Sequence, residues 1–112
     1  MRHAAVAILF VATLCAAMAA RADFDHSHAA WSALLKQHVV VIDGGKASKV
    51  RYSGFVADRA ALQAYLASLA AVSESEFRAF SKPQQLAFLI NAYNAHMIEK
   101  VLTKYPDLRS VW

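Results

Sequence analysis

Residues 81–104 read SKPQQLAFLINAYNAHMIEKVLTK, and they predict the longest element of the fold. Ser81 is a good N-cap residue, because its hydroxyl can accept a hydrogen bond from a free backbone N–H of the first turn. Pro83 is tolerated in that turn, and Gln84 stands three residues after the serine, which is the spacing of a capping box. We therefore expect a central helix over about residues 83–104.

The apolar residues of this helix fall on two nearly opposite faces when successive residues are placed about 100° apart. One face carries Leu86, Leu89, Ile90, Tyr93, Met97 and Val101. The other carries Phe88, Asn91, Ala95, Ile98 and Leu102. A helix that is apolar on two sides is expected to be buried on two sides. The pattern thus predicts a helix that other elements cover on both faces.

A short β element is predicted over about residues 39–55. The run Val39–Ile42 is β-branched, and Asp43-Gly44-Gly45 follows it as a strong turn signal. The side chains of Ser48–Phe55 then alternate between polar and apolar, which is typical of a half-buried strand. A small hairpin around the turn is the expected structure.

Three more helices are predicted, one before the β element and two after it. The first runs from Ala29 to about Val40, and the second runs from Arg59 to Ala71 with Asp58 as its N-cap. The third is short and begins after Ser73, which has capping-box spacing to a glutamate. Their apolar stripes contain Trp31, Leu34, Leu35 and His38, then Leu62, Tyr65, Leu66 and Leu69, then Phe77 and Phe80. The fold class is therefore predicted as α+β and mostly α-helical, in a single domain over residues 23–112.

This domain is expected to be incomplete. The helices and the small β element offer thin cover for a central helix with two apolar faces. The chain also stops at Ser110-Val111-Trp112, an apolar end without a terminating signal. We expect a truncated domain that packs within the same molecule against a missing C-terminal half.

Residues 1–22 are predicted to be a secretory signal peptide. A short positive start precedes the uncharged apolar run Ala4–Leu14, and Ala20-Arg21-Ala22 gives the small-x-small pattern of a cleavage site. Cleavage is expected after Ala22, which leaves no membrane span in the mature chain. The protein is thus predicted to be exported from a bacterium, to the periplasm or by full secretion.

Composition excludes several classes of function. The net charge of +4 includes two leader arginines, so the mature chain has ten basic against eight acidic residues, or +2. Without a clustered basic face, a nucleic-acid partner is excluded. The single cysteine, Cys15, lies in the leader, so the mature chain has no thiolate nucleophile or cysteine zinc site. We expect no cofactor, and the protein partner stays unknown.

The most informative stretch is Asn91-Ala92-Tyr93-Asn94. Asn91 falls on an apolar face and Asn94 at the boundary between faces, and a buried amide costs about 1–3 kcal/mol if it finds no partner. These two asparagines could orient a substrate or a catalytic imidazole. Alternatively, they hold the backbone of a neighbouring loop.

Four histidines outside the leader are candidates for chemistry. His26 and His28 form a His-x-His pair near two aspartates and could bind a metal, although a frayed polar terminus is the simpler interpretation. His38 shares an apolar stripe and is expected to pack in the core. His96 lies near Glu99 on the polar stripe, where the pair could act as a general acid or could be solvated surface.

The order of these features resembles the family known as domain of unknown function 547. The residues that carry the resemblance are Trp31, Leu34-Leu35, Val50-Arg51-Tyr52, Leu62, Tyr65-Leu66 and Ala87–Ala95. It covers about residues 29–112, and Asn-Ala-Tyr-Asn is its most specific part. The resemblance implies that family members continue into a segment with a His and a Cys-Pro pair, which this sequence does not reach. It implies no established activity.

Two functions stay open at this point, and with them the question of whether the protein is an enzyme. The first is an exported module of the cell envelope that has no catalytic residues in this chain. The alternative is the N-terminal part of a Cys-His dependent hydrolase or acyl-transfer enzyme whose nucleophile lies beyond residue 112. In that case Asn91 or Asn94 would orient the histidine or stabilise an oxyanion.

Overall fold

A computed structural model describes residues 23–107 of the chain. The predicted leader with Cys15 and the cleavage site after Ala22 lies outside the described residues, and so does the apolar end Ser110-Val111-Trp112. The elements are α2 (Ala29–His38), β1 (Val39–Ile42), the 3-10 turn η1 (Asp43–Gly45), β2 (Ala47–Val50), α3 (Tyr52–Ala57), α4 (Arg59–Ala70), α5 (Glu74–Ala79) and α6 (Lys82–Leu102). An α+β, mostly helical fold is confirmed.

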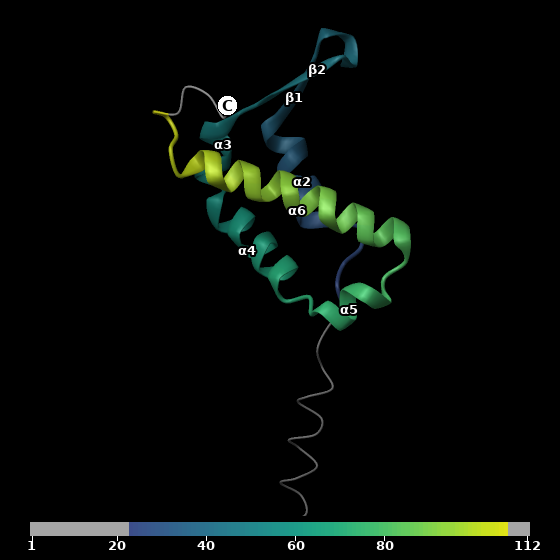
Figure 1. Ribbon diagram of the computed structural model, residues 1–112. Helices are drawn as coiled ribbons and strands as arrows, with labels where there is room; N and C mark the ends of the chain where they lie inside the picture. The colour runs from purple at the N-terminus through teal and green to yellow at the C-terminus, as the bar shows by residue number, and fades with distance from the viewer. Residues whose placement is uncertain (1–22, 108–112) are drawn as a thin grey trace, which may run out of the picture.

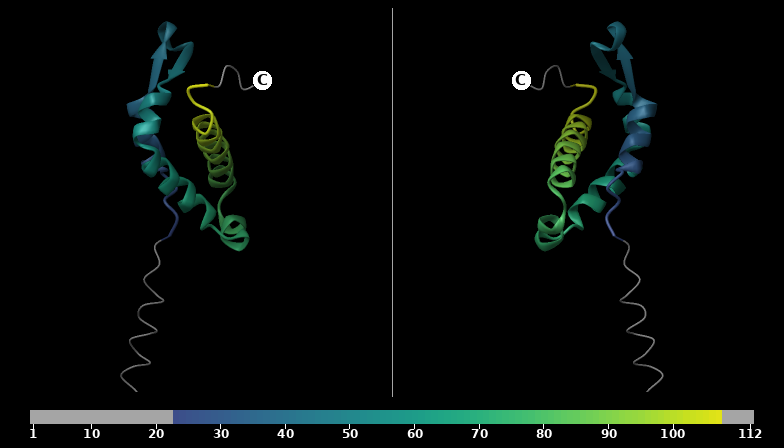
Figure 2. Two further views of the ribbon diagram at one scale, coloured as in Figure 1. Left: turned by 90° about the vertical axis from the view of Figure 1, so that its left-hand side faces the viewer. Right: turned by 90° about the vertical axis from the view of Figure 1, so that its right-hand side faces the viewer.

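The helices form two layers (Figures 1 and 2). Helix α6 lies on one side of the molecule, and α2, α3 and α4 lie on the other, with α4 in contact with both α2 and α6. The buried cluster between the layers contains Trp31, Leu34, Phe55, Leu62, Tyr65, Leu69, Ala95 and Leu102. The single core thus lies between the layers and takes side chains from α2, α3 and α4 on one side and from α6 on the other.

The predicted start of α6 is confirmed. The Ser81 hydroxyl accepts from the Gln84 N–H at 3.2 Å, and the Gln84 side chain accepts from the Ser81 N–H at 2.9 Å. This reciprocal pair is a capping box, and Pro83 occupies the first turn. The cap of α5 is confirmed as well, because the Ser73 hydroxyl accepts from the Glu76 N–H at 3.1 Å.

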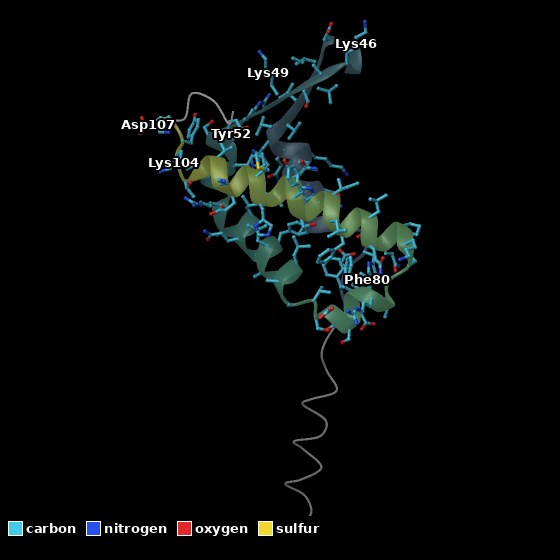
Figure 3. The ribbon with its side chains drawn as sticks, in the orientation of Figure 1. Lys46, Lys49, Tyr52, Phe80, Lys104 and Asp107 are labelled. Atoms are coloured by element: carbon cyan, nitrogen blue, oxygen red, sulfur yellow. The ribbon has the colours of Figure 1, made fainter. Side chains whose placement is uncertain are left out.

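The β element is shorter than predicted. Strands β1 and β2 pair in antiparallel register from Val39 opposite Val50 to Ile42 opposite Ala47, and the hairpin projects away from the helices (Figures 1 and 3). Residues 52–57 form helix α3, so the predicted extension to residue 55 is wrong. The physical reason is the register. The residue before Val39 is helical, so no extended partner remains for the chain after Val50.

The predicted N-cap of α4 is only half right. Asp58 stands at the N-cap position, but its side chain makes no capping hydrogen bond. Its carboxylate instead binds His38 Nε2 at 2.6 Å, and the His38 side chain is 12% exposed. The Asp58 carboxylate thus binds a side chain of α2 instead of the free N–H groups at the start of its own helix. His38 is packed between the helices, as predicted.

Helix α6 is buried along its core face, whereas the opposite face is open over Leu86–Tyr93 and covered near its C-terminal end, where Val101 is 7% exposed. The predicted burial on both faces is therefore wrong for residues 86–93. The face with Ala95 and Leu102 packs in the core, together with the half-buried Phe88 and Ile98. The opposite face exposes Leu86, Leu89, Ile90 and Tyr93. The reason is the arrangement of layers: α2, α3 and α4 all lie on the same side of α6 (Figure 2).

None of the helices within residues 23–107 combines the length and the apolar character that crossing a membrane requires.

Candidate functional site

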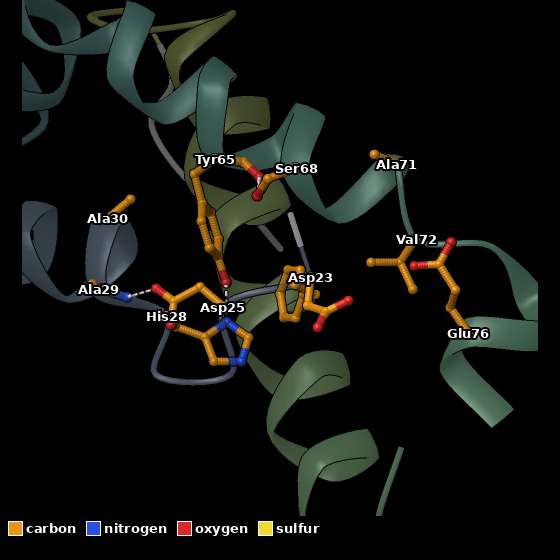
Figure 4. Close-up of a pocket in the computed structure, with 11 residues that line it drawn as sticks. Asp23, Asp25, His28, Ala29, Ala30, Tyr65, Ser68, Ala71, Val72 and Glu76 are labelled. Carbon is orange, nitrogen blue, oxygen red and sulfur yellow. Dashed lines mark hydrogen bonds between the residues drawn. The ribbon is translucent and has the colours of Figure 1, made fainter. Parts of the chain in front are cut away.

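A cavity of about 350 Å³ lies where the N-terminal segment meets α2, α4 and the start of α5 (Figure 4). Its walls contain apolar side chains such as Val72 and three acidic side chains, Asp23, Asp25 and Glu76. His28 and Tyr65 come together at its floor from residues 37 apart in the chain. This cavity is the first candidate site.

The His28–Tyr65 pair joins the N-terminal segment to α4. His28 Nδ1 lies 2.7 Å from the Tyr65 hydroxyl, and the two residues are 5% and 4% exposed. His28 Nε2 is buried with no hydrogen-bond partner among the described residues. The backbone of His28 has a φ of 51°, in the left-handed region that histidine adopts more readily than most residues. The pair therefore closes the turn that leads into α2.

Burial keeps both side chains neutral around pH 7. It lowers the pKa of His28, and the attraction of Asp25 does not compensate. It also raises the pKa of Tyr65 to about 12, with a smaller contribution from the charge of Asp25. Two neutral side chains that share one hydrogen bond stabilise the contact between the N-terminal segment and α4, but they are poor proton donors at neutral pH.

Two of the three acidic side chains of the cavity, Asp25 and Glu76, serve local structure. The Asp25 carboxylate accepts from the Ser27 hydroxyl at 2.6 Å and from the Ala29 N–H at 3.1 Å, and these bonds lower its pKa. Glu76 accepts from the Ser73 hydroxyl at 3.1 Å, within the cap of α5. The arrangement therefore supports docking of the N-terminal segment more than it supports ligand chemistry.

The two histidines of the His-x-His pair have different surroundings. The His26 ring packs edge-on against Phe80, with 4.4 Å between ring centroids, in a cluster that also contains Phe24, Phe77 and Phe88. Phe80 is labelled beside α5 in Figure 3. His28 is committed to Tyr65. Across residues 23–107, no group of three or more His, Cys, Asp or Glu side chains is arranged to hold a metal ion.

The second candidate site is the open face of α6, which we call the outward face: Leu86, Leu89, Ile90 and Tyr93. Their exposed fractions are 60%, 56%, 51% and 68%. The spacing of three, four and seven residues from Leu86 places them in one stripe along about two turns. Large apolar side chains that gather on one exposed stripe are typical of an interaction surface.

The two predicted orienting asparagines lie on the same helix as this face. Asn94 is exposed and follows Tyr93, whereas Asn91 is half-buried nearer the core side of α6. Since Asn94 is exposed, the cost of burying an amide does not apply to it. The structure thus places the Asn-Ala-Tyr-Asn stretch partly on the outward face.

Sequence reasoning missed the ion pair that joins α4 to α6. Arg59 donates to Glu99 from Nη2 at 2.7 Å and from Nε at 3.1 Å, a bidentate contact. The Glu99 carboxylate is therefore bound to Arg59, while the His96 side chain is exposed to solvent. No sequence signal could have found this pair, because its members are 40 residues apart.

Comparison with protein-family models, with curated proteins and with solved structures finds no match to this chain.

Proposed function

We propose that this chain is an exported binding module that recognises a partner through the outward face of α6. The observation that carries the proposal is the exposure of Leu86, Leu89, Ile90 and Tyr93, each more than half exposed in one stripe. Burying one such side chain contributes about 1.5–3 kcal/mol. Covering the stripe would therefore supply a substantial part of a binding free energy.

The outward face is separate from the face that holds the fold together. The core side of α6 contains Ala95 at 0% and Leu102 at 4% exposed, and the ion pair of Glu99 fixes the same side to α4. A partner can thus cover the outward face without displacing any core residue. In this respect α6 has the layout of a helix with one face for folding and one for binding.

Export enters the proposal from the sequence alone. The leader pattern of residues 1–22 supports export and with it a place in the cell envelope, whereas the resemblance to domain of unknown function 547 carries no activity into the proposal. The alternative function, the N-terminal part of a Cys-His hydrolase or acyl-transfer enzyme, stays a prediction. The binding module is preferred because its key surface is present among the described residues.

The test compares one charged substitution inside the outward face with a matched one outside it. Leu89→Glu places a carboxylate in the stripe, while Val41→Glu places one on β1 at a side chain that is 68% exposed. Tagged exported chains of both kinds and of wild type are used to capture proteins from envelopes of the source bacterium. A captured protein is then purified and titrated against all three.

The wild-type chain should bind the purified partner with one-to-one stoichiometry. Leu89→Glu should weaken binding at least about tenfold, because about 1.4 kcal/mol is lost per factor of ten. Val41→Glu should leave the affinity unchanged. Equal affinity of Leu89→Glu and wild type would refute the proposal, and so would the absence of any protein that wild type captures and Leu89→Glu does not.

A further inference from the structure

A lysine lies beyond each end of the outward face of α6. Lys82 and Lys100 are 18 residues apart, which is five turns or about 27 Å, so both side chains lie on the same line of the helix. That line also passes close to Leu86 and Tyr93. The outward face is therefore an apolar stripe bracketed lengthwise by two positive charges.

No acidic side chain of α6 balances these lysines. The helix contains one acidic residue, Glu99, and its carboxylate is turned to Arg59 of α4. Lys82 contacts the amide oxygen of Gln85 at 3.5 Å, and no ion pair of either lysine is present among residues 23–107. A partner that covers the stripe thus meets uncompensated positive charge at both ends.

A second copy of the chain is a poor occupant for this surface. An antiparallel pair of α6 helices that overlays the two stripes is centred near Leu89 and Ile90. This register brings Lys82 of one copy within about one turn of Lys100 of the other, twice in each pair. A parallel pair sets each lysine against its own counterpart. Like charges at close range oppose both arrangements.

A lipid surface fits the pattern poorly as well. Helices that lie in a bilayer interface combine an apolar face with a strongly charged opposite face that is rich in Lys and Arg. On α6 the side opposite the outward face packs in the core through Ala95 and Leu102, so it offers no such charged face. The two lysines at the ends of the stripe match a helical partner with charges at two points better than they match a membrane surface.

Taking the outward face as the binding face proposed above, we infer that its partner is an amphipathic helix of another protein whose apolar stripe is bracketed by carboxylates about 27 Å apart. Such a helix can pack along α6 with a small crossing angle, so that contact persists over the whole length between the lysines. The carboxylates then meet Lys82 and Lys100 while the apolar residues cover the stripe.

The test uses two synthetic helical peptides of about 25 residues with the same leucine stripe in the middle turns. One peptide carries glutamates at the two bracketing positions, and the other carries lysines there. Binding to the exported chain is followed by fluorescence anisotropy at low and at moderate salt. The chain is used as wild type, as the double variant Lys82→Glu with Lys100→Glu, as Leu89→Glu and as Val41→Glu.

The wild-type chain should bind the glutamate peptide at least about tenfold more tightly than the lysine peptide, with a preference that weakens as salt rises. The double lysine variant should reverse that preference, and Leu89→Glu should abolish binding while Val41→Glu does not. Reversal by the double variant excludes a purely structural effect of the lysines.

Other results overturn the inference in distinguishable ways. Binding that requires Leu89 but ignores the peptide charge would refute the acidic partner and leave the proposed function standing. The same holds if sedimentation shows a dimer that Leu89→Glu dissociates, or if phosphatidylglycerol vesicles bind the chain through Leu89 while neither peptide does. No binding of either peptide would refute the inference, whereas the proposed function is decided by the capture experiment, in which the absence of any protein that depends on Leu89 would refute it.

Discussion

Replacing Gly54 by alanine should destabilise the protein, because the structure leaves no room for a methyl group there. A Cβ atom at Gly54 would lie 2.3 Å from His38 Nδ1 and 2.8 Å from Cε1. The ring cannot swing away freely, since Asp58 holds its other nitrogen at 2.6 Å and the Phe55 ring packs against it at a tilt, with 4.9 Å between centroids. The substitution therefore forces the ring out of its place and strains the contact between α2 and α3.

The size of the effect follows from two opposing contributions. Overpacking of this kind costs about 1–3 kcal/mol. Replacing a helical glycine by alanine returns about 0.5–1 kcal/mol, because alanine loses less backbone entropy on folding. We expect a net loss of about 1–2 kcal/mol in the free energy of unfolding, measured by urea denaturation and followed by far-UV circular dichroism.

The control is the same substitution in a His38→Ala background. Without the ring, the alanine at position 54 has space, so Gly54→Ala should be neutral or should stabilise by up to about 1 kcal/mol. An equal loss in both backgrounds would show that His38 is not the obstacle. No loss in the wild-type background would contradict the packing described here.

Four further outcomes follow from the same structure. Burial raises the pKa of Tyr65 to about 12, so its contribution to the free energy of unfolding is present below about pH 10 and is lost as the pH rises toward 12. In the variant Tyr65→Phe, the urea midpoint should therefore decline less over this alkaline range. Because burial lowers the pKa of His28, the free energy of unfolding should also fall as pH drops below about 6.5, and a His28→Phe variant should show a smaller decline. Leu62→Ala, at a side chain with 0% exposure, should cost about 2–5 kcal/mol, whereas Leu89→Ala should stay within about 0.5 kcal/mol of wild type; similar losses would argue against separate folding and binding faces. The intact mass of the exported protein should correspond to cleavage after Ala22, and a mass that retains residues 1–22 would contradict the predicted leader.

The sequence was most informative where structure is local. The caps of α5 and α6 depend on residues three positions apart, and both were predicted correctly. Asp58 was predicted as a cap by the same logic, but His38, 20 residues away, binds its carboxylate. A local pattern cannot reveal a competitor that only the tertiary fold brings near.

The same limit explains the outward face. Angular positions along α6 separate an apolar face with Ala95 and Leu102 from one with Leu89 and Tyr93, but they also place the buried Val101 with the exposed pair. Periodicity cannot state which of the two faces the neighbouring helices cover, because that depends on how the layers are arranged. The His28–Tyr65 pair and the Arg59–Glu99 pair escaped prediction for this reason as well.

The central claim is that a partner covers the outward face of α6 in the natural setting of the protein. Hydroxyl-radical labelling measures this directly, by comparing the reactivity of Leu86, Leu89, Ile90 and Tyr93 in intact cells that produce the protein with that in the purified chain. Val41 serves as the internal reference, because it is as exposed as Tyr93 at 68% and lies on β1. We expect strong protection of the outward face in these cells and no protection at Val41. Equal reactivity of the outward face in both samples would contradict the claim.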